Sequence, residues 1–135
     1  HLRLWVVLDE SVLHRVVTSP DVMREQLEHL NALGAEPYVS VQVLPLTAGA
    51  HPGLSGPFSL LQSADSTAAK VVHLPRFTSD LYLEEPSDVR LYSGMYDHLQ
   101  AQALDPESSR DVHHRRHQVL HRHGKPAPAV AGSGP

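Results

Sequence analysis

The histidines near the carboxyl end are the residues whose type and spacing could most directly support chemistry. On a helix, His113, His117 and His121 would stand on successive turns of one face. Imidazoles at this spacing can chelate zinc, nickel or copper without any cysteine. However, Asp111 is the only nearby carboxylate, and the cations of the same stretch would repel a dication. We therefore interpret the stretch as a solvated helix end, treat the three histidines as weak metal candidates, and expect no cofactor.

A carboxylate pair and an imidazole stand about one helical turn apart near the amino end. Asp9 and Glu10 precede His14 at a spacing that suits a general base and its orienting partner, provided that the group lines a pocket. The sequence contains no Gly-x-Ser-x-Gly motif to supply a nucleophile beside them. We interpret the two carboxylates as the acidic first turn of a helix, which the helix dipole favours.

A glycine-rich segment at residues 49–56 has the composition of a phosphate-binding loop. Such a loop needs its glycines to lead into a helix, with a Lys or Arg nearby. Here the segment contains no cation and leads into an apolar run at Phe58. We predict a loop that connects strands, long enough to hold a ligand.

The elements that must position these residues follow from hydrophobic periodicity. Apolar or alternating runs predict four strands and one short piece that is either a strand or a cross-over, at residues 2–8, 39–44, 58–61, 70–74 and 81–83. Helices are predicted after Asp9, after Ser19-Pro20, where Gly34 should end the helix in a left-handed conformation, and after Pro86 and Asp105-Pro106. This order predicts an α+β fold, a mostly antiparallel sheet of four or five strands with helices packed on one face.

Length and composition fit one globular domain, since the chain has 135 residues, of which 41% are hydrophobic and 19% charged. We place the domain at residues 2–112 and predict that the His/Arg-rich, then Pro/Ala/Gly-rich tail at 113–135 is disordered. Truncation after Ser109 is therefore expected to leave folding unchanged. Cysteine is absent and no apolar run is long enough to span a membrane, which fits a cytoplasmic protein.

The net charge of −4 is unevenly distributed. Residues 1–109 hold six Lys/Arg against fourteen Asp/Glu, whereas residues 110–135 hold five Lys/Arg against one Asp. A body with a charge of −8 repels a phosphate backbone, so we expect no sequence-specific DNA binding by this chain alone.

Several strings of the sequence together carry a family resemblance. They are Trp-Val-Val-Leu-Asp-Glu-Ser-Val-Leu at residues 5–13, Val-Met-Arg-Glu-Gln-Leu-Glu-His-Leu at 22–30, Val-Gln-Val-Leu-Pro-Leu at 41–46, Gly-Ala-His at 49–51, Gly-Pro-Phe at 56–58 and Leu-Tyr-Leu-Glu at 81–84. In this order they resemble the domain of unknown function found C-terminal to an XRE-type helix-turn-helix in actinobacterial regulators. These regulators include WhiJ-like proteins and antitoxin-like members of the Scr class. The resemblance covers residues 2 to 112.

The resemblance implies a non-enzymatic sensing or protein-binding module of an antitoxin-like transcriptional regulator. It places the candidate effector- or partner-binding residues at Glu10, His51, Tyr82 and Glu84. Because such regulators are typically encoded beside small proteins, the implied ligand is a small partner protein, with a small-molecule effector as the other option. DNA would be bound only through a helix-turn-helix, which this sequence lacks. The alternative from another class is a metal-binding or hydrolytic protein that uses the histidine-rich segment.

Three departures from the family pattern bear on this interpretation. The Pro-Gly-Leu-Leu-Gln-Thr segment that normally precedes the first strand is absent, so we interpret the chain as a fragment, whose uncovered apolar surface favours self-association. The Tyr-x-Glu usual in the third strand is replaced by His73-Leu74-Pro75-Arg76. The last helix is less amphipathic than is usual in the family.

Overall fold

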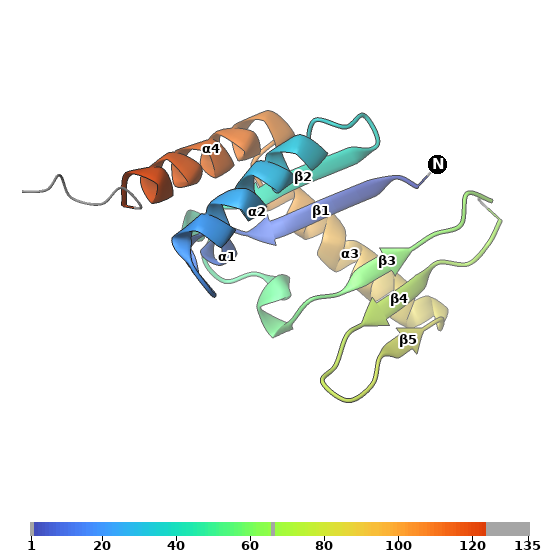
Figure 1. Cartoon of the computed structure of the whole chain (residues 1–135). Coiled ribbons are helices and arrows are strands. Elements are labelled where there is room, and N and C mark those ends of the chain that lie inside the picture. Colours follow the sequence, from blue (N-terminus) through green and yellow to red (C-terminus); the bar gives the residue numbers. More distant parts are fainter. Residues whose placement is uncertain (1, 66, 124–135) are drawn as a thin grey trace, which may run out of the picture. The chain divides into compact units, whose positions relative to one another are not determined.

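The computed structural model divides the chain into two units, and it describes residues 2–65 and 67–123. The first unit combines the residues up to Val43 with those from Leu104 onward, and the second unit is Leu44–Ala103 (Figure 1). The chain therefore leaves the first unit after Val43 and returns to it at Leu104. The single domain expected from the length stays a prediction, and the two units are compact parts of the chain.

The first unit is built on a parallel pair of strands, β1 (Leu4–Asp9) and β2 (Val39–Leu44). A parallel pair needs a long crossover connection, which here contains the short helix α1 (Ser11–His14) and the longer helix α2 (Pro20–Leu33). Helix α4 (Pro106–His123) lies along α2, as Figure 1 shows.

Both predicted cap-and-proline signals start helices. The Val22 backbone N–H donates to Ser19 Oγ over 3.3 Å at the start of α2, and the Ser108 N–H donates to Asp105 Oδ1 over 2.8 Å at the start of α4. Gly34 does follow the last residue of α2, but with φ −68° it is right-handed rather than left-handed. A tight turn ends this helix instead, because the Gly34 N–H donates to the carbonyls of Leu30 and Ala32.

The hydrophobic core of the first unit joins α1, α2, β2 and α4. Its fully buried members are Leu13, Leu27, Val43 and Leu120, and Met23, Leu30 and Val112 pack against them. Helix α4 thus contributes Leu120 and Val112 to this core. The boundary expected after residue 112 falls inside α4, whose residues up to His123 are helical, and residues 124–135 of the expected tail lie outside the described residues.

A buried polar network ties the start of α4 to β2. The Trp5 indole N–H donates to Gln42 Oε1 over 2.7 Å, and the Gln42 side-chain amide donates to the Leu104 carbonyl over 2.9 Å. The Val43 N–H donates to Ser109 Oγ over 2.8 Å, and the Leu104 N–H donates to the Val43 carbonyl over 2.9 Å. Every one of these bonds links segments that are far apart in the sequence.

Replacing Ser109 by alanine is expected to lower the free energy of unfolding by about 1–3 kcal/mol, because the buried Val43 N–H would lose its acceptor. Chemical denaturation of the variant against the wild type measures this cost. Ser87→Ala, at an exposed position of the second unit, serves as the control and should leave stability unchanged. Equal stability of both variants would show that the Val43–Ser109 bond contributes nothing.

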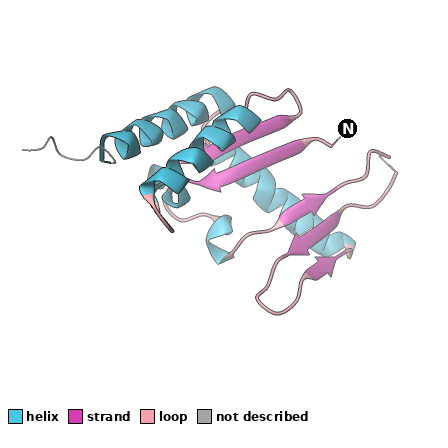
Figure 2. Cartoon of the chain, viewed as in Figure 1, coloured by secondary structure: helices cyan, strands magenta, loops and turns pink. Residues whose placement is uncertain are grey.

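The second unit begins with a loop that contains two short 3-10 turns, Leu46–Ala48 and Pro52–Ser55. Three short strands follow, β3 (Ser59–Leu61), β4 (Val71–Leu74) and β5 (Leu81–Leu83), and then helix α3 (Pro86–Gln102). The strands form an antiparallel sheet in the order β3-β4-β5, drawn in magenta in Figure 2. The predicted hairpin between β3 and β4 is present, and the 81–83 piece is a strand.

One face of this sheet packs against α3. Successive residues of a strand point to opposite faces, and the register places Leu60, Val72 and Leu83 in one row. Val72 is fully buried, and the ring of Phe58, which shares this face, contacts Tyr92 of α3 edge-on with centroids 5.2 Å apart. The opposite row, Ser59, His73 and Tyr82, therefore lies on the outer face of the sheet.

The predicted single sheet of four or five mostly antiparallel strands is wrong. The fold is α+β, but it has a two-stranded parallel sheet and a separate three-stranded antiparallel sheet. The connections between the strands explain why there are two sheets. A crossover through helices joins β1 to β2 and allows them to run parallel, whereas hairpins join β3, β4 and β5 and make them antiparallel. The first strand is only partly buried, and Trp5 is 53% exposed.

Candidate functional site

The outer face of the three-stranded sheet gathers most of the polar and aromatic side chains that could bind a partner. Tyr82 lies at the middle of β5, and Asp80 and Glu84 lie two residues before and after it. Because side chains alternate along a strand, all three belong to the same face as His73. Two sequence candidates, Tyr82 and Glu84, are thus brought together.

His73 connects the neighbouring strands of this face. Its ring stacks on that of Tyr82, with centroids 5.0 Å apart and an angle of 28° between the planes. Its Nε2 lies 3.4 Å from Asp80 Oδ2, a contact that becomes an ion pair when the imidazole is protonated. The ring stack joins β4 to β5 on this face, whereas His73 Nε2 is buried and neither accepts nor donates a hydrogen bond within the described residues.

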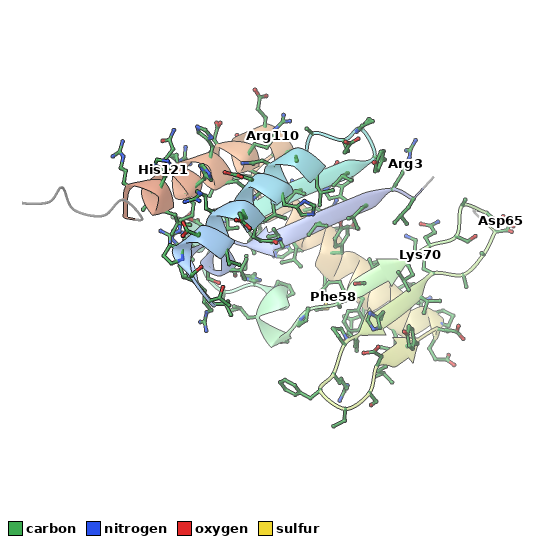
Figure 3. The ribbon with its side chains drawn as sticks, viewed as in Figure 1. Arg3, Phe58, Asp65, Lys70, Arg110 and His121 are labelled. Atoms are coloured by element: carbon green, nitrogen blue, oxygen red, sulfur yellow. The ribbon has the colours of Figure 1, made fainter. Side chains whose placement is uncertain are left out.

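Large apolar side chains are also exposed on or beside the outer face. Tyr82 is 58% exposed and Leu61, which lies opposite Val71 in the register, is 50% exposed. Phe77, in the loop between β4 and β5, is fully exposed. Figure 3 labels Phe58, which belongs to the opposite face against α3, and Asp65, at the tip of the β3–β4 hairpin. The outer face thus combines exposed apolar area with carboxylates.

The two remaining sequence candidates lie elsewhere. Glu10 belongs to the first unit, where its Oε1 lies 3.2 Å from His14 Nε2, so the expected carboxylate–imidazole pair is formed, at an exposed position. His51 belongs to the second unit and precedes the 3-10 turn Pro52–Ser55, which packs against α3. His51 therefore lies near α3, and Tyr82 lies on the other face of the sheet.

The three histidines of α4 have different surroundings, although they follow one another at helical spacing. His113 is 1% exposed, and neither of its ring nitrogens has a hydrogen-bond partner. His117 Nε2 lies 2.7 Å from Glu28 Oε1 on α2, and His121 is exposed at the far end of α4 (Figure 3). Within residues 2–65 and 67–123, no group of three or more His, Asp or Glu side chains is placed to hold a metal ion.

Burial lowers the pKa of the His113 imidazole below its ordinary value of 6.5, because the protonated ring would lose its hydration. His113 is therefore a neutral, buried residue of α4 at neutral pH. The expected solvated helix end is in fact packed at His113 and Leu120 and exposed only at positions such as His114 and His121.

The outer face offers recognition groups but no activated nucleophile among the described residues. Ser59 lies opposite His73 in the register, yet no hydrogen bond joins the two side chains. A serine acts as a nucleophile only when a base takes its proton through such a bond. What the arrangement provides is an aromatic surface with an imidazole and carboxylates, which suits binding.

Sequence reasoning missed His73, Asp80 and Leu61 as members of this face. The alternation of Asp80, Tyr82 and Glu84 at every second residue could have shown that these three share one face of a strand. The pairing of Tyr82 with His73 depends on the strand register, which the hairpin loops do not reveal by their sequence alone.

The chain thus combines an α+β fold with a partly apolar, acidic outer face on its three-stranded sheet. Over residues 1–115 the chain matches the family described as a domain of unknown function (DUF5753), and it belongs to that family. No curated protein and no solved structure matches it. None of the helices in the part of the chain that the structure describes is long and apolar enough to cross a membrane.

Proposed function

We propose that the chain is a non-enzymatic, protein-binding module of an antitoxin-like transcriptional regulator and that the outer face of the β3-β4-β5 sheet binds the partner. The family membership and the XRE-type resemblance of the sequence support the regulatory context. In that context DNA is bound by a helix-turn-helix segment outside this sequence, and the protein acts in the cytoplasm. A small protein encoded beside the gene is the first partner to test.

The exposure of aromatic and apolar side chains on this face is the observation that carries the proposal. Helix α3 covers one face of the sheet, while Tyr82 and Leu61 on the other face remain at least half exposed. Tyrosine is among the residues that most often dominate the energy of protein interfaces, because its ring buries a large area and its hydroxyl group still finds a hydrogen bond. Exposed apolar patches with a polar surround mark interaction sites.

Replacing Tyr82 by alanine is expected to weaken binding of the purified neighbour-encoded protein at least about tenfold, as loss of a central interface tyrosine does. Isothermal titration calorimetry with the full chain gives the dissociation constants. Leu91→Ala is the matched control, because Leu91 is 59% exposed, as Tyr82 is, but lies on α3. Its affinity should equal that of the wild type.

Two outcomes would contradict the proposal. If the neighbour-encoded protein does not bind the wild-type chain, the partner-binding function is wrong. If it binds but Tyr82→Ala and Leu91→Ala retain equal affinity, the binding site lies away from the outer face.

A further inference from the structure

We propose that the partner binds as an extended, positively charged segment that pairs with the edge of β5 and extends the three-stranded sheet. This inference rests on the proposed function and adds to it the chemistry and the conformation of the partner.

Strand β5 lies at the edge of the sheet and, among the described strands, pairs only with β4. An edge strand presents backbone N–H and C=O groups, and extended peptides commonly bind by adding a strand there. The opposite edge strand, β3, begins two residues after Pro57, and residues 56–64 contain no charged side chain. The two edges therefore differ in electrostatic character.

The charged residues that adjoin β5 in the sequence are all negative. Residues 80–88 contain no Lys or Arg and four carboxylates, which belong to Asp80, Glu84, Glu85 and Asp88. Glu84 and Glu85 are exposed and form no ion pair within the described part of the chain, whereas Asp80 contacts His73. A second copy of β5 would place carboxylates against carboxylates, which opposes self-pairing at this edge. A strand that carries Lys or Arg would instead meet complementary charge.

The two faces of β5 define an alternating pattern for the added strand. On the outer face, the partner's side chains would lie beside Tyr82 and the flanking carboxylates, where a cation gains both ion pairs and contact with an aromatic ring. On the α3 side they would lie beside Leu81, which is 38% exposed, and Leu83, where apolar side chains fit. The segment that fits best alternates cationic and apolar residues.

The probes are fluorescein-labelled nine-residue peptides, added to the full chain and followed by fluorescence anisotropy. One peptide alternates Lys and Val, and a second has Glu in place of Lys. Two further Lys–Val peptides are N-methylated, either at every Val or at every Lys. Because the N–H groups of alternate residues in a strand point to opposite edges, only one of these two peptides loses its pairing with β5.

The Lys–Val peptide is expected to bind at least tenfold more tightly than the Glu–Val peptide. One of the N-methylated peptides should lose at least tenfold in affinity, while the other retains it and serves as the matched control. Glu84→Gln should weaken Lys–Val binding about two- to fivefold, the size expected for an exposed ion pair. Asp97→Asn, which removes an exposed carboxylate of α3, should leave binding unchanged.

Equal binding of the Lys–Val and Glu–Val peptides would overturn the charge preference, and equal loss or equal retention in both N-methylated peptides would overturn strand addition. A competition assay, in which the peptides and the neighbour-encoded protein are added together to the full chain, distinguishes failure of this inference from failure of the proposed function. If the neighbour-encoded protein binds through Tyr82 but no peptide competes with it, only the inference fails. If the peptides bind as expected and that protein does not, the proposed function fails and the preference of β5 for a cationic strand stands.

Discussion

A chain that ends at Ser109 should lose the cooperative thermal unfolding of its first unit. Truncation there removes Leu120 and Val112 from the core, and it removes the Arg116 side chain, which donates to the carbonyls of Leu13 and His14 on α1. Loss of one buried leucine side chain alone typically costs about 2–5 kcal/mol, a large part of the stability of a small domain. The sequence predicted that this truncation leaves folding unchanged. The structure instead leads us to expect a severe loss of folding stability.

Circular dichroism during heating measures this effect. Leu120→Ala should show a graded version of it, with a lower midpoint but a retained transition, and the exposed Arg122→Ala serves as the control that leaves the midpoint unchanged. An unaltered melting curve for the truncated chain would show that α4 does not contribute to the core of the first unit.

Lowering the pH from 7 to 5 should destabilise the first unit through His113. Burial lowers the pKa of this imidazole in the folded chain, whereas in the unfolded chain the group has its ordinary value of 6.5. Below about pH 6.5 the unfolded chain therefore binds a proton that the folded chain resists, so the stability present at neutral pH is lost as the pH falls. The contribution of one such group has a limiting slope of about 1.4 kcal/mol per pH unit.

The variant His113→Leu isolates this effect. An apolar side chain of similar size has no polar atoms to leave unpaired, so it should raise the free energy of unfolding at pH 7 by about 1 kcal/mol and remove the acid-dependent loss. Urea denaturation at several pH values measures both. The other charged or titratable groups that link α4 to α1 and α2, namely the His117–Glu28 pair and Arg116, are present unchanged in both proteins. Parallel pH profiles for wild type and variant would contradict the role of His113.

Local signals in the sequence predicted the individual elements well, because short-range chemistry determines them. Ser19-Pro20 and Asp105-Pro106 start helices through capping bonds between neighbours in the chain, and the alternation in residues 39–44 reflects the two sides of one strand. These features depend on residues a few positions apart, so a single sequence is enough to indicate them.

The arrangement of these elements was predicted poorly, because it depends on partners that are distant in the sequence. Gln42 bonds to Trp5 and to the Leu104 carbonyl, and no local pattern identifies such partners. The same holds for the histidines of α4. His113, His117 and His121 have the spacing of a chelating face, yet His113 is buried in the folded chain while His121 is exposed. The four candidates from the resemblance do not form one site. Tyr82 and Glu84 share one face of the sheet, His51 lies near α3 in the same unit, and Glu10 lies in the other unit.

The bond between the Leu104 N–H and the Val43 carbonyl brings the two ends of the second unit close together. The sixty residues of the second unit leave the first unit after Val43 and re-enter it at Leu104, and a 2.9 Å backbone hydrogen bond joins these two residues. Segments whose ends lie this close are the ones that insertion and replacement tolerate best. Replacement of the whole second unit would therefore leave the parallel strands and α4 joined by the same short junction.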